Sequence, residues 1–252
     1  MTTDLRMSLG NKWLYLTCLV VFCVLLRPCI EPLTPLIDGR ADIDYITLTA
    51  HRSMFSGLMP FAVLFCVIPY ACSFFDEMKS GFTRSALLHT TRRRYIAGKL
   101  LAVTVSGALA LVIPYALTGA IGYALCQPVV APQVPDFYVD TSWEPVLARW
   151  GGESMLLLQV LLAGLYGAVW SLSGLFCSCL FKHRLTAIVV PFVGYQTIWT
   201  LFMGSRYCPL LYLTADYAVL PSIGFVLSMQ ALYLSVFLIL SYAGMKWRCR
   251  YA

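Results

Sequence analysis

The chain has 252 residues, of which 60% are hydrophobic and only 12% charged, and its formal net charge is +6. A soluble domain carries roughly 25% charged residues, so this composition excludes an ordinary soluble protein. Apolar stretches of about 20 residues, enough for a helix to cross a bilayer, recur along the chain. The sequence therefore predicts an all-α integral membrane protein, with one transmembrane domain over residues 1–252.

The apolar stretches predict six transmembrane helices. They cover residues 12–30, 54–75, 100–126, 154–181, 185–203 and 223–245. The first could be the core of a signal peptide, because Arg6 and Lys12 precede it. However, Arg27 and Pro28 follow it without a small-residue cleavage site, so we expect a retained helix.

The distribution of Lys and Arg predicts the orientation. If the N-terminus is cytoplasmic, 13 of the 18 Lys and Arg residues fall in cytoplasmic segments. Cytoplasmic loops carry such an excess, so both termini are expected inside. The net charge then reflects topology, and we expect no nucleic-acid partner.

The ten cysteines do not indicate a metal site, because no C-x-x-C pair is present and Cys177 and Cys179 have no nearby histidine. Cys29, Cys126 and Cys208 fall near the predicted outer face. A disulfide among these three is left open.

The cytoplasmic segment 76–99 is the most distinctive part of the chain. It begins with the acids Asp76 and Glu77 and ends with a basic cluster at Arg92–Arg94. The acids can meet basic groups on a partner or cap a helix. The arginines can contact a partner or anionic lipid headgroups. We interpret this segment as a surface that a cytoplasmic partner binds.

Small and polar residues mark several spans. Ala163, Gly167 and Ser171 recur every four residues, a spacing that lets helices pack closely. The strongest polar groups inside the fifth and sixth spans are Tyr195, Gln196, Thr200 and Gln230. They serve either interhelical hydrogen bonds or a substrate path. We expect Tyr195, Gln196 and Thr200 to face a cavity or a protomer interface, because an unpaired amide in hydrocarbon costs several kcal/mol.

The sequence also limits the possible chemistry. We expect no ionisable side chain in the middle of a span, with only Arg27 near an outer end, and this argues against transport driven by an ion gradient. Gly98-Lys99 lacks the rest of a phosphate-binding loop, and the three histidines fall in loops. The chain is therefore not expected to be an enzyme, and we assign no catalytic or metal-binding residue.

The six-span pattern and the 76–99 segment resemble the permease subunits of type-2 ABC exporters. The resemblance is carried by Glu77, Gly81, Arg93 and Gly98-Lys99, and by residues 204–222, which are similar to the family's re-entrant outer segment between spans five and six. It implies a short coupling helix between spans two and three. Asp76, Glu77, Gly81, Arg93, Gly98 and Lys99 would then couple the chain to a separate ATPase.

The resemblance also implies partners. ATP and Mg²⁺ would bind to the ATPase subunit, and this chain would hold no cofactor. A second permease copy or a related permease would complete the path, in the inner membrane of a bacterium. The cargo would be an amphipathic or hydrophobic molecule, such as a peptide, an antibiotic or a lipid-like compound. The alternative is a non-transporting membrane scaffold or accessory subunit of a larger complex.

Overall fold

The structure is a computed structural model, and it describes residues 2–37, 44–127, 129, 131, 134–181 and 183–250. Over these residues the fold is all-α, with one isolated β-bridge between Asp44 and Gln127. The described helices, where η marks a 3-10 helix, are α1 (Thr2–Leu9), α2 (Lys12–Ile37), α3 (Tyr45–Phe55), η1 (Met59–Phe61), α4 (Ala62–Val67), α5 (Ser73–Lys79), α6 (Phe82–His89), α7 (Arg92–Leu125), η2 (Asp136–Tyr138), α8 (Glu144–Leu180), α9 (Arg184–Phe202), η3 (Pro209–Tyr212) and α10 (Ile223–Arg248).

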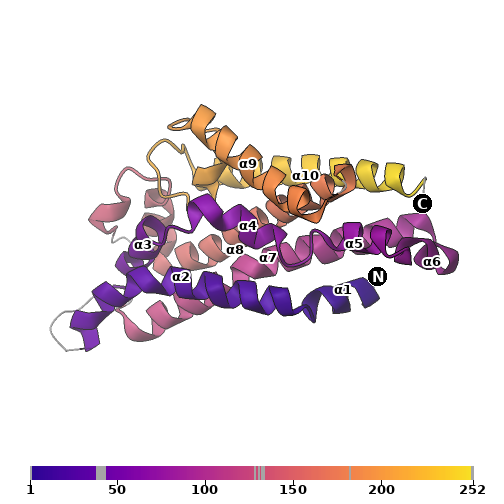
Figure 1. Ribbon diagram of the computed structural model, residues 1–252. Helices are drawn as coiled ribbons and strands as arrows, with labels where there is room; N and C mark the ends of the chain where they lie inside the picture. Colours follow the sequence, from indigo (N-terminus) through magenta and orange to yellow (C-terminus); the bar gives the residue numbers. More distant parts are fainter. Residues whose placement is uncertain are drawn as a thin grey trace.

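Five of the described helices are long and apolar enough to cross a membrane: α2, α7, α8, α9 and α10. They overlap five of the six predicted ranges, and they identify the chain as a multi-pass membrane protein. The helices form an elongated bundle (Figure 1). The first helix, α1, and the last turns of α10 lie at the end that carries α5 and α6, and α3 lies at the opposite end (Figure 1).

The predicted span over residues 54–75 is not a continuous helix, and here the prediction needs correction. The segment contains η1, α4 and a turn before α5 begins at Ser73. Pro60 lies within η1 and Pro69 follows α4, and Gly57 has a φ of +64°. Proline lacks an amide donor and disfavours a helical conformation of the preceding residue. These residues interrupt the helix that the apolar composition of residues 54–75 predicted.

The centre of the bundle is the contact between α7 and α8. A Cβ atom at Gly107 would collide with Ser171, and one at Gly167 would collide with the backbone of Gly107. The small residues predicted to form a contact surface on the fourth span therefore bring two helix backbones together. Such close contact replaces hydrophobic driving force as the means of helix association in lipid.

The segment after α9 forms a compact cap at the end of the bundle that carries α3. Its short helix η3 is buried, and so are Leu213, Thr214 and Ala215. Side chains donate to its carbonyls: Trp143 Nε1 to Thr214 O (2.9 Å), Ser142 Oγ to Ala215 O (2.6 Å) and Gln230 Nε2 to Tyr212 O (2.8 Å). The irregular backbone is thus satisfied by its neighbours. The three cysteines considered for a disulfide, Cys29, Cys126 and Cys208, are free thiols.

Candidate functional site

Helices α5 and α6 form a bent arm at the end of the bundle where α1 begins (Figure 1). The bend is at Gly81, whose φ of +75° lies in the left-handed region that glycine adopts without strain. Asp76, Gly81 and Arg93 are exposed, whereas Gly98 and Lys99 are buried. The residues that the resemblance grouped together therefore divide between an outer and an inner face.

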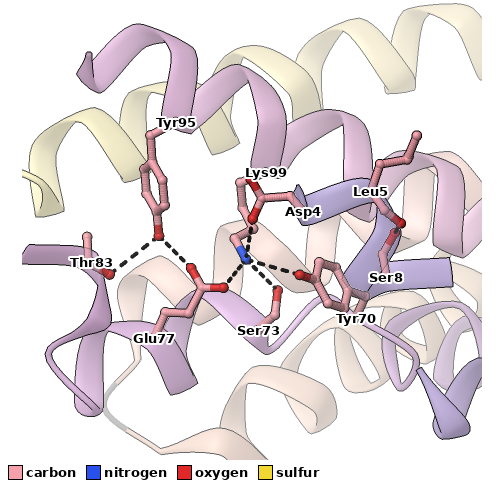
Figure 2. Close-up of polar contacts among 9 residues, drawn as sticks. All are labelled: Asp4, Leu5, Ser8, Tyr70, Ser73, Glu77, Thr83, Tyr95 and Lys99. Carbon is pink, nitrogen blue, oxygen red and sulfur yellow. Dashed lines mark hydrogen bonds and ion pairs between the residues drawn. The ribbon is translucent and has the colours of Figure 1, made fainter. Parts of the chain in front are cut away.

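The inner face of the arm centres on Lys99, whose side chain is fully buried (Figure 2). Its Nζ lies 2.5 Å from Glu77 Oε1 and 3.6 Å from Asp4 Oδ1. The same ammonium donates to Tyr70 Oη and Ser73 Oγ, each at 3.4 Å. A cation removed from water is stabilised by such opposite charges and acceptors. Lys99 thereby joins α7 to α1 and α5.

The second oxygen of Glu77 extends this cluster. Tyr95 Oη donates to Glu77 Oε2 at 2.6 Å, and it lies 3.4 Å from Thr83 Oγ1 at the start of α6 (Figure 2). Glu77 is only 14% exposed. We call Asp4, Glu77, Tyr95 and Lys99 the inner ion cluster. It connects both helices of the arm to α1 and to the first turns of α7.

The sequence analysis expected Glu77 to meet basic groups of a partner or to cap a helix. In the structure its basic contact is Lys99, a residue of the same chain that lies 22 positions further on. Asp76, by contrast, is about half exposed, and its Oδ2 lies 3.8 Å from Arg184 Nη1 at the start of α9. Of these two acids, only Asp76 lies where a partner can reach it.

The outer face of the arm combines apolar and basic side chains. Leu88 is 85% exposed and Phe82 is 49% exposed. Lys79, Arg93 and Arg94 are also exposed, whereas Arg92 Nη2 donates to Cys249 O at 2.6 Å and so joins α7 to the end of α10. The accessible surface here thus combines apolar and basic side chains with the half-exposed Asp76.

The residues proposed for a path occupy three different settings. Tyr195 is fully buried, and its Oη donates to Met59 O at 2.8 Å; Gln196 is half-buried and its Nε2 donates to Pro60 O at 2.8 Å. Thr200 is exposed and its hydroxyl donates to Gln196 O on the same helix. Tyr195 and Gln196 thus donate hydrogen bonds to carbonyls of the interrupted segment at η1, which have no partner within a helix.

Gln230, the fourth proposed path residue, lies away from the other three. It is 2% exposed and donates to the cap described above. Tyr195, together with Trp170, lines an apolar cavity of about 390 Å³ between α8, α9 and α10. The four residues therefore do not line one common surface.

Arg52 is a buried ionisable side chain that the sequence analysis did not single out. This residue of α3, which falls between the first two predicted spans, is 2% exposed. Its Nη1 donates to Thr118 Oγ1 (2.9 Å) and Tyr115 O (3.4 Å), and its Nη2 to Gln159 Oε1 (2.5 Å). Arg52 thereby joins α3 to α7 and α8.

A helical reading of residues 45–55 would have found Arg52. Tyr45, Leu48 and Thr49 are buried, and positions 45, 48, 49 and 52 share one face of a helix. Within the described residues, no group of three or more His, Cys, Asp or Glu side chains is arranged to hold a metal ion. No family model, curated protein or solved structure matches this chain.

Proposed function

We propose that this chain is the membrane-spanning permease subunit of an ATP-driven ABC exporter in a bacterial inner membrane. Its arm would dock a separate ATPase that binds ATP and Mg²⁺. A second permease copy or a related permease would complete the translocation path. The observation that carries the proposal is the arm itself, because its outer face is exposed while its inner face is joined by charge to the first turns of α7.

In this proposal the two faces of the arm have separate tasks. The exposed Leu88 and Phe82 of α6, together with the exposed Lys79 and Arg93, supply the contact with the ATPase. Apolar anchors surrounded by charged residues are the usual composition of such an interface. The partner surface that complements this face is a hydrophobic groove with acidic residues around it.

The inner ion cluster then transmits motion. A displacement of α5 pulls on Glu77, and the buried Lys99 passes that displacement to α7, which packs along α8. Buried ion pairs resist separation because each charge would be left without its partner in a poorly solvating environment. Nucleotide-driven closure of the ATPases would in this way reshape the cavity between protomers.

The cargo that we propose is amphipathic or hydrophobic. The cavity lined by Tyr195 and Trp170 is predominantly apolar, which suits such a molecule. Gln196 and Thr200 lie on the same helix, beside that cavity, and Gln230 lies on α10. In this proposal Tyr195 contacts cargo, whereas Gln196 and Gln230 hold the backbone that shapes the cavity.

The test uses the complex purified from native membranes through a tag on this chain. In this proposal any Mg²⁺-ATP hydrolysis in the purified complex comes from a partner, because Gly98-Lys99 lacks the rest of a phosphate-binding loop. Leu88→Asp should remove that activity and the copurifying ATPase. Leu185→Asp, at another leucine that is 75% exposed, is the matched control and should retain both.

The variant Glu77→Lys tests docking of the ATPase separately from transmission of its motion to α7. It places a second cation beside Lys99, so we expect the ATPase to copurify while its activity no longer responds to cargo. A wild-type complex without ATPase would support the alternative, a scaffold or accessory subunit. If the ATPase copurified equally with Leu88→Asp and with wild type, the arm would not be the docking surface.

A further inference from the structure

The last two long helices, α9 and α10, hardly touch each other. Helix α9 packs against α8 and α4, and α10 packs against α8 and α7. The apolar cavity of about 390 Å³ described above lies between them, with α8 as its floor. Its inner lining includes the buried Trp170 and Tyr195, whereas its rim residues Ile198, Val236 and Leu240 are 37–43% exposed. The cavity therefore opens sideways, toward the lipid that surrounds these two apolar helices.

The indole of Trp170 brings an unused hydrogen-bond donor to this cavity. Trp170 is 6% exposed, and its ring packs against the rings of Tyr166, Tyr195 and Phe237. Within the described residues its indole N–H has no hydrogen-bond acceptor. Trp170 lies ten positions before Leu180, the last residue of α8, about 15 Å of helix and half of the ~30 Å hydrocarbon core. An unpaired donor at that depth is costly.

The remaining polar groups of the lining limit what the cavity can bind. Ser173 Oγ donates to Trp170 O (2.7 Å), and Tyr195 Oη donates to Met59 O (2.8 Å). Tyr233 of α10 is half-buried, and its hydroxyl forms no hydrogen bond with any described residue. Among the described residues that line the cavity, none is an Asp, Glu, Lys, Arg or His. A ligand thus finds two free donors there and no counter-ion for a charge.

We propose that the cavity binds an uncharged lipid-like molecule that enters from the bilayer between α9 and α10, with a carbonyl oxygen at Trp170 Nε1 and an apolar chain along the walls. An ester or amide carbonyl accepts the indole hydrogen bond without bringing a charge into hydrocarbon. Cavities of this size hold small organic ligands. Such a molecule would be the cargo of the proposed exporter, so its role rests on that proposed function, whereas its binding requires no ATPase.

The test measures competition for a photoactivatable ligand in nanodiscs that contain the purified full chain. The probe is methyl palmitate with a diazirine in its acyl chain, and mass spectrometry locates the labelled residues. We expect labels on the rim residues Ile198, Val236 and Leu240. Unlabelled methyl palmitate should compete about fivefold better than heptadecane, the effect of one hydrogen bond. Hexadecyltrimethylammonium should compete less well than either, because the cavity offers its charge no partner.

Two variants with matched controls test the two parts of the site. Trp170→Phe removes the donor and keeps an aromatic ring, so methyl palmitate and heptadecane should compete equally. Trp13→Phe, at a tryptophan that is 51% exposed, should keep the wild-type preference. Gly194→Leu fills the cavity without a clash, since no atom lies within 4 Å of a Cβ there, and should reduce labelling about tenfold. Gly119→Leu, at a groove between α7 and α8, should be labelled as wild type is.

Equal competition by methyl palmitate and heptadecane in wild type would overturn the proposal, and so would labelling that Gly194→Leu leaves unchanged. A second copy of the chain seated between α9 and α10 would also overturn it. That arrangement would prevent labelling and would let Ile198→Cys, in an otherwise cysteine-free variant, form a disulfide between copies.

Copurification of an ATPase from native membranes tests the exporter proposal separately. The expected binding without a copurifying ATPase would support the lipid site and contradict the exporter. An ATPase that copurifies with a chain lacking the ester preference would support the exporter and contradict this site.

Discussion

Two cations are buried among the described residues, and their surroundings differ. Lys99, in the inner ion cluster, has two carboxylates within ion-pair distance, together with hydroxyl acceptors. Arg52, at the other end of α7, has neutral acceptors, a ring 4.7 Å below its guanidinium and an adjacent groove. The first charge takes part in direct ion pairs, whereas the hydrogen-bond acceptors of the second are neutral groups.

This difference separates two uses of a buried charge. An internally paired cation holds helices in a fixed relation, since breaking the pair leaves a charge without a partner. A cation that binds neutral acceptors joins helices through hydrogen bonds, whose loss costs less. Lys99 therefore holds the arm through ion pairs, and Arg52 joins α3 to α7 and α8 through hydrogen bonds. The following changes test that distinction.

The largest effect is expected at Lys99. Lys99→Met leaves Glu77 and Asp4 beside an apolar side chain, and we expect a loss of about 3–5 kcal/mol in the free energy of unfolding. Thermal or denaturant unfolding in detergent micelles measures this loss. Adding Glu77→Gln to Lys99→Met should restore part of it. The control, Lys79→Met, replaces an exposed lysine of the same arm and should change stability by less than about 0.5 kcal/mol.

A smaller effect is expected at Arg52. Arg52→Met removes hydrogen bonds to neutral groups, so the expected loss is about 1–3 kcal/mol in the same unfolding assay. Adding Gln159→Leu should recover part of the loss, because it removes the amide left without its partner. If Arg52→Met were as costly as Lys99→Met, the distinction between the two cations would fail.

The smallest effect concerns the bend of the arm. Gly81→Ala forces an alanine into the left-handed region and should cost about 1 kcal/mol. The control, Gly194→Ala, lies in a helix with open space around its Cβ and should not destabilise the protein. Because the bend positions Glu77, Gly81→Ala should be non-additive with Lys99→Met and additive with Arg52→Met. If Gly81→Ala were additive with both Lys99→Met and Arg52→Met, the bend would not be coupled to the inner ion cluster.

The long helices could be predicted from the sequence because hydropathy over about 20 residues reports a property of each segment alone. The same method failed over residues 54–75, where composition is apolar but Pro60 and Pro69 interrupt the helix. Hydropathy does not indicate which backbone groups can form helical hydrogen bonds. The positions of proline and glycine do indicate where a helix is interrupted. Tyr195 and Gln196, found as polar residues in an apolar helix, proved to serve that interrupted backbone.

The inner ion cluster could be predicted only in part. Glu77 and Lys99 were both singled out, but no local pattern places them in contact, since the arm must first fold back onto α7. Arg52 was missed because a charged residue between two predicted spans was read as a loop residue. Its burial depends on the packing of α3 against α7 and α8, and sequence periodicity supports that packing only once α3 is treated as a helix.

The cap formed by residues 209–215 has a consequence for biosynthesis. Its carbonyls receive hydrogen bonds from Ser142 and Trp143, which are made early, and from Gln230, which is made late. Contacts between distant parts of a chain form slowly because closing a long loop is entropically unfavourable. The cap therefore completes only after α10 has left the ribosome and entered the membrane. Until then the carbonyl of Tyr212 lacks its donor, and the cap of the partly made protein is incomplete.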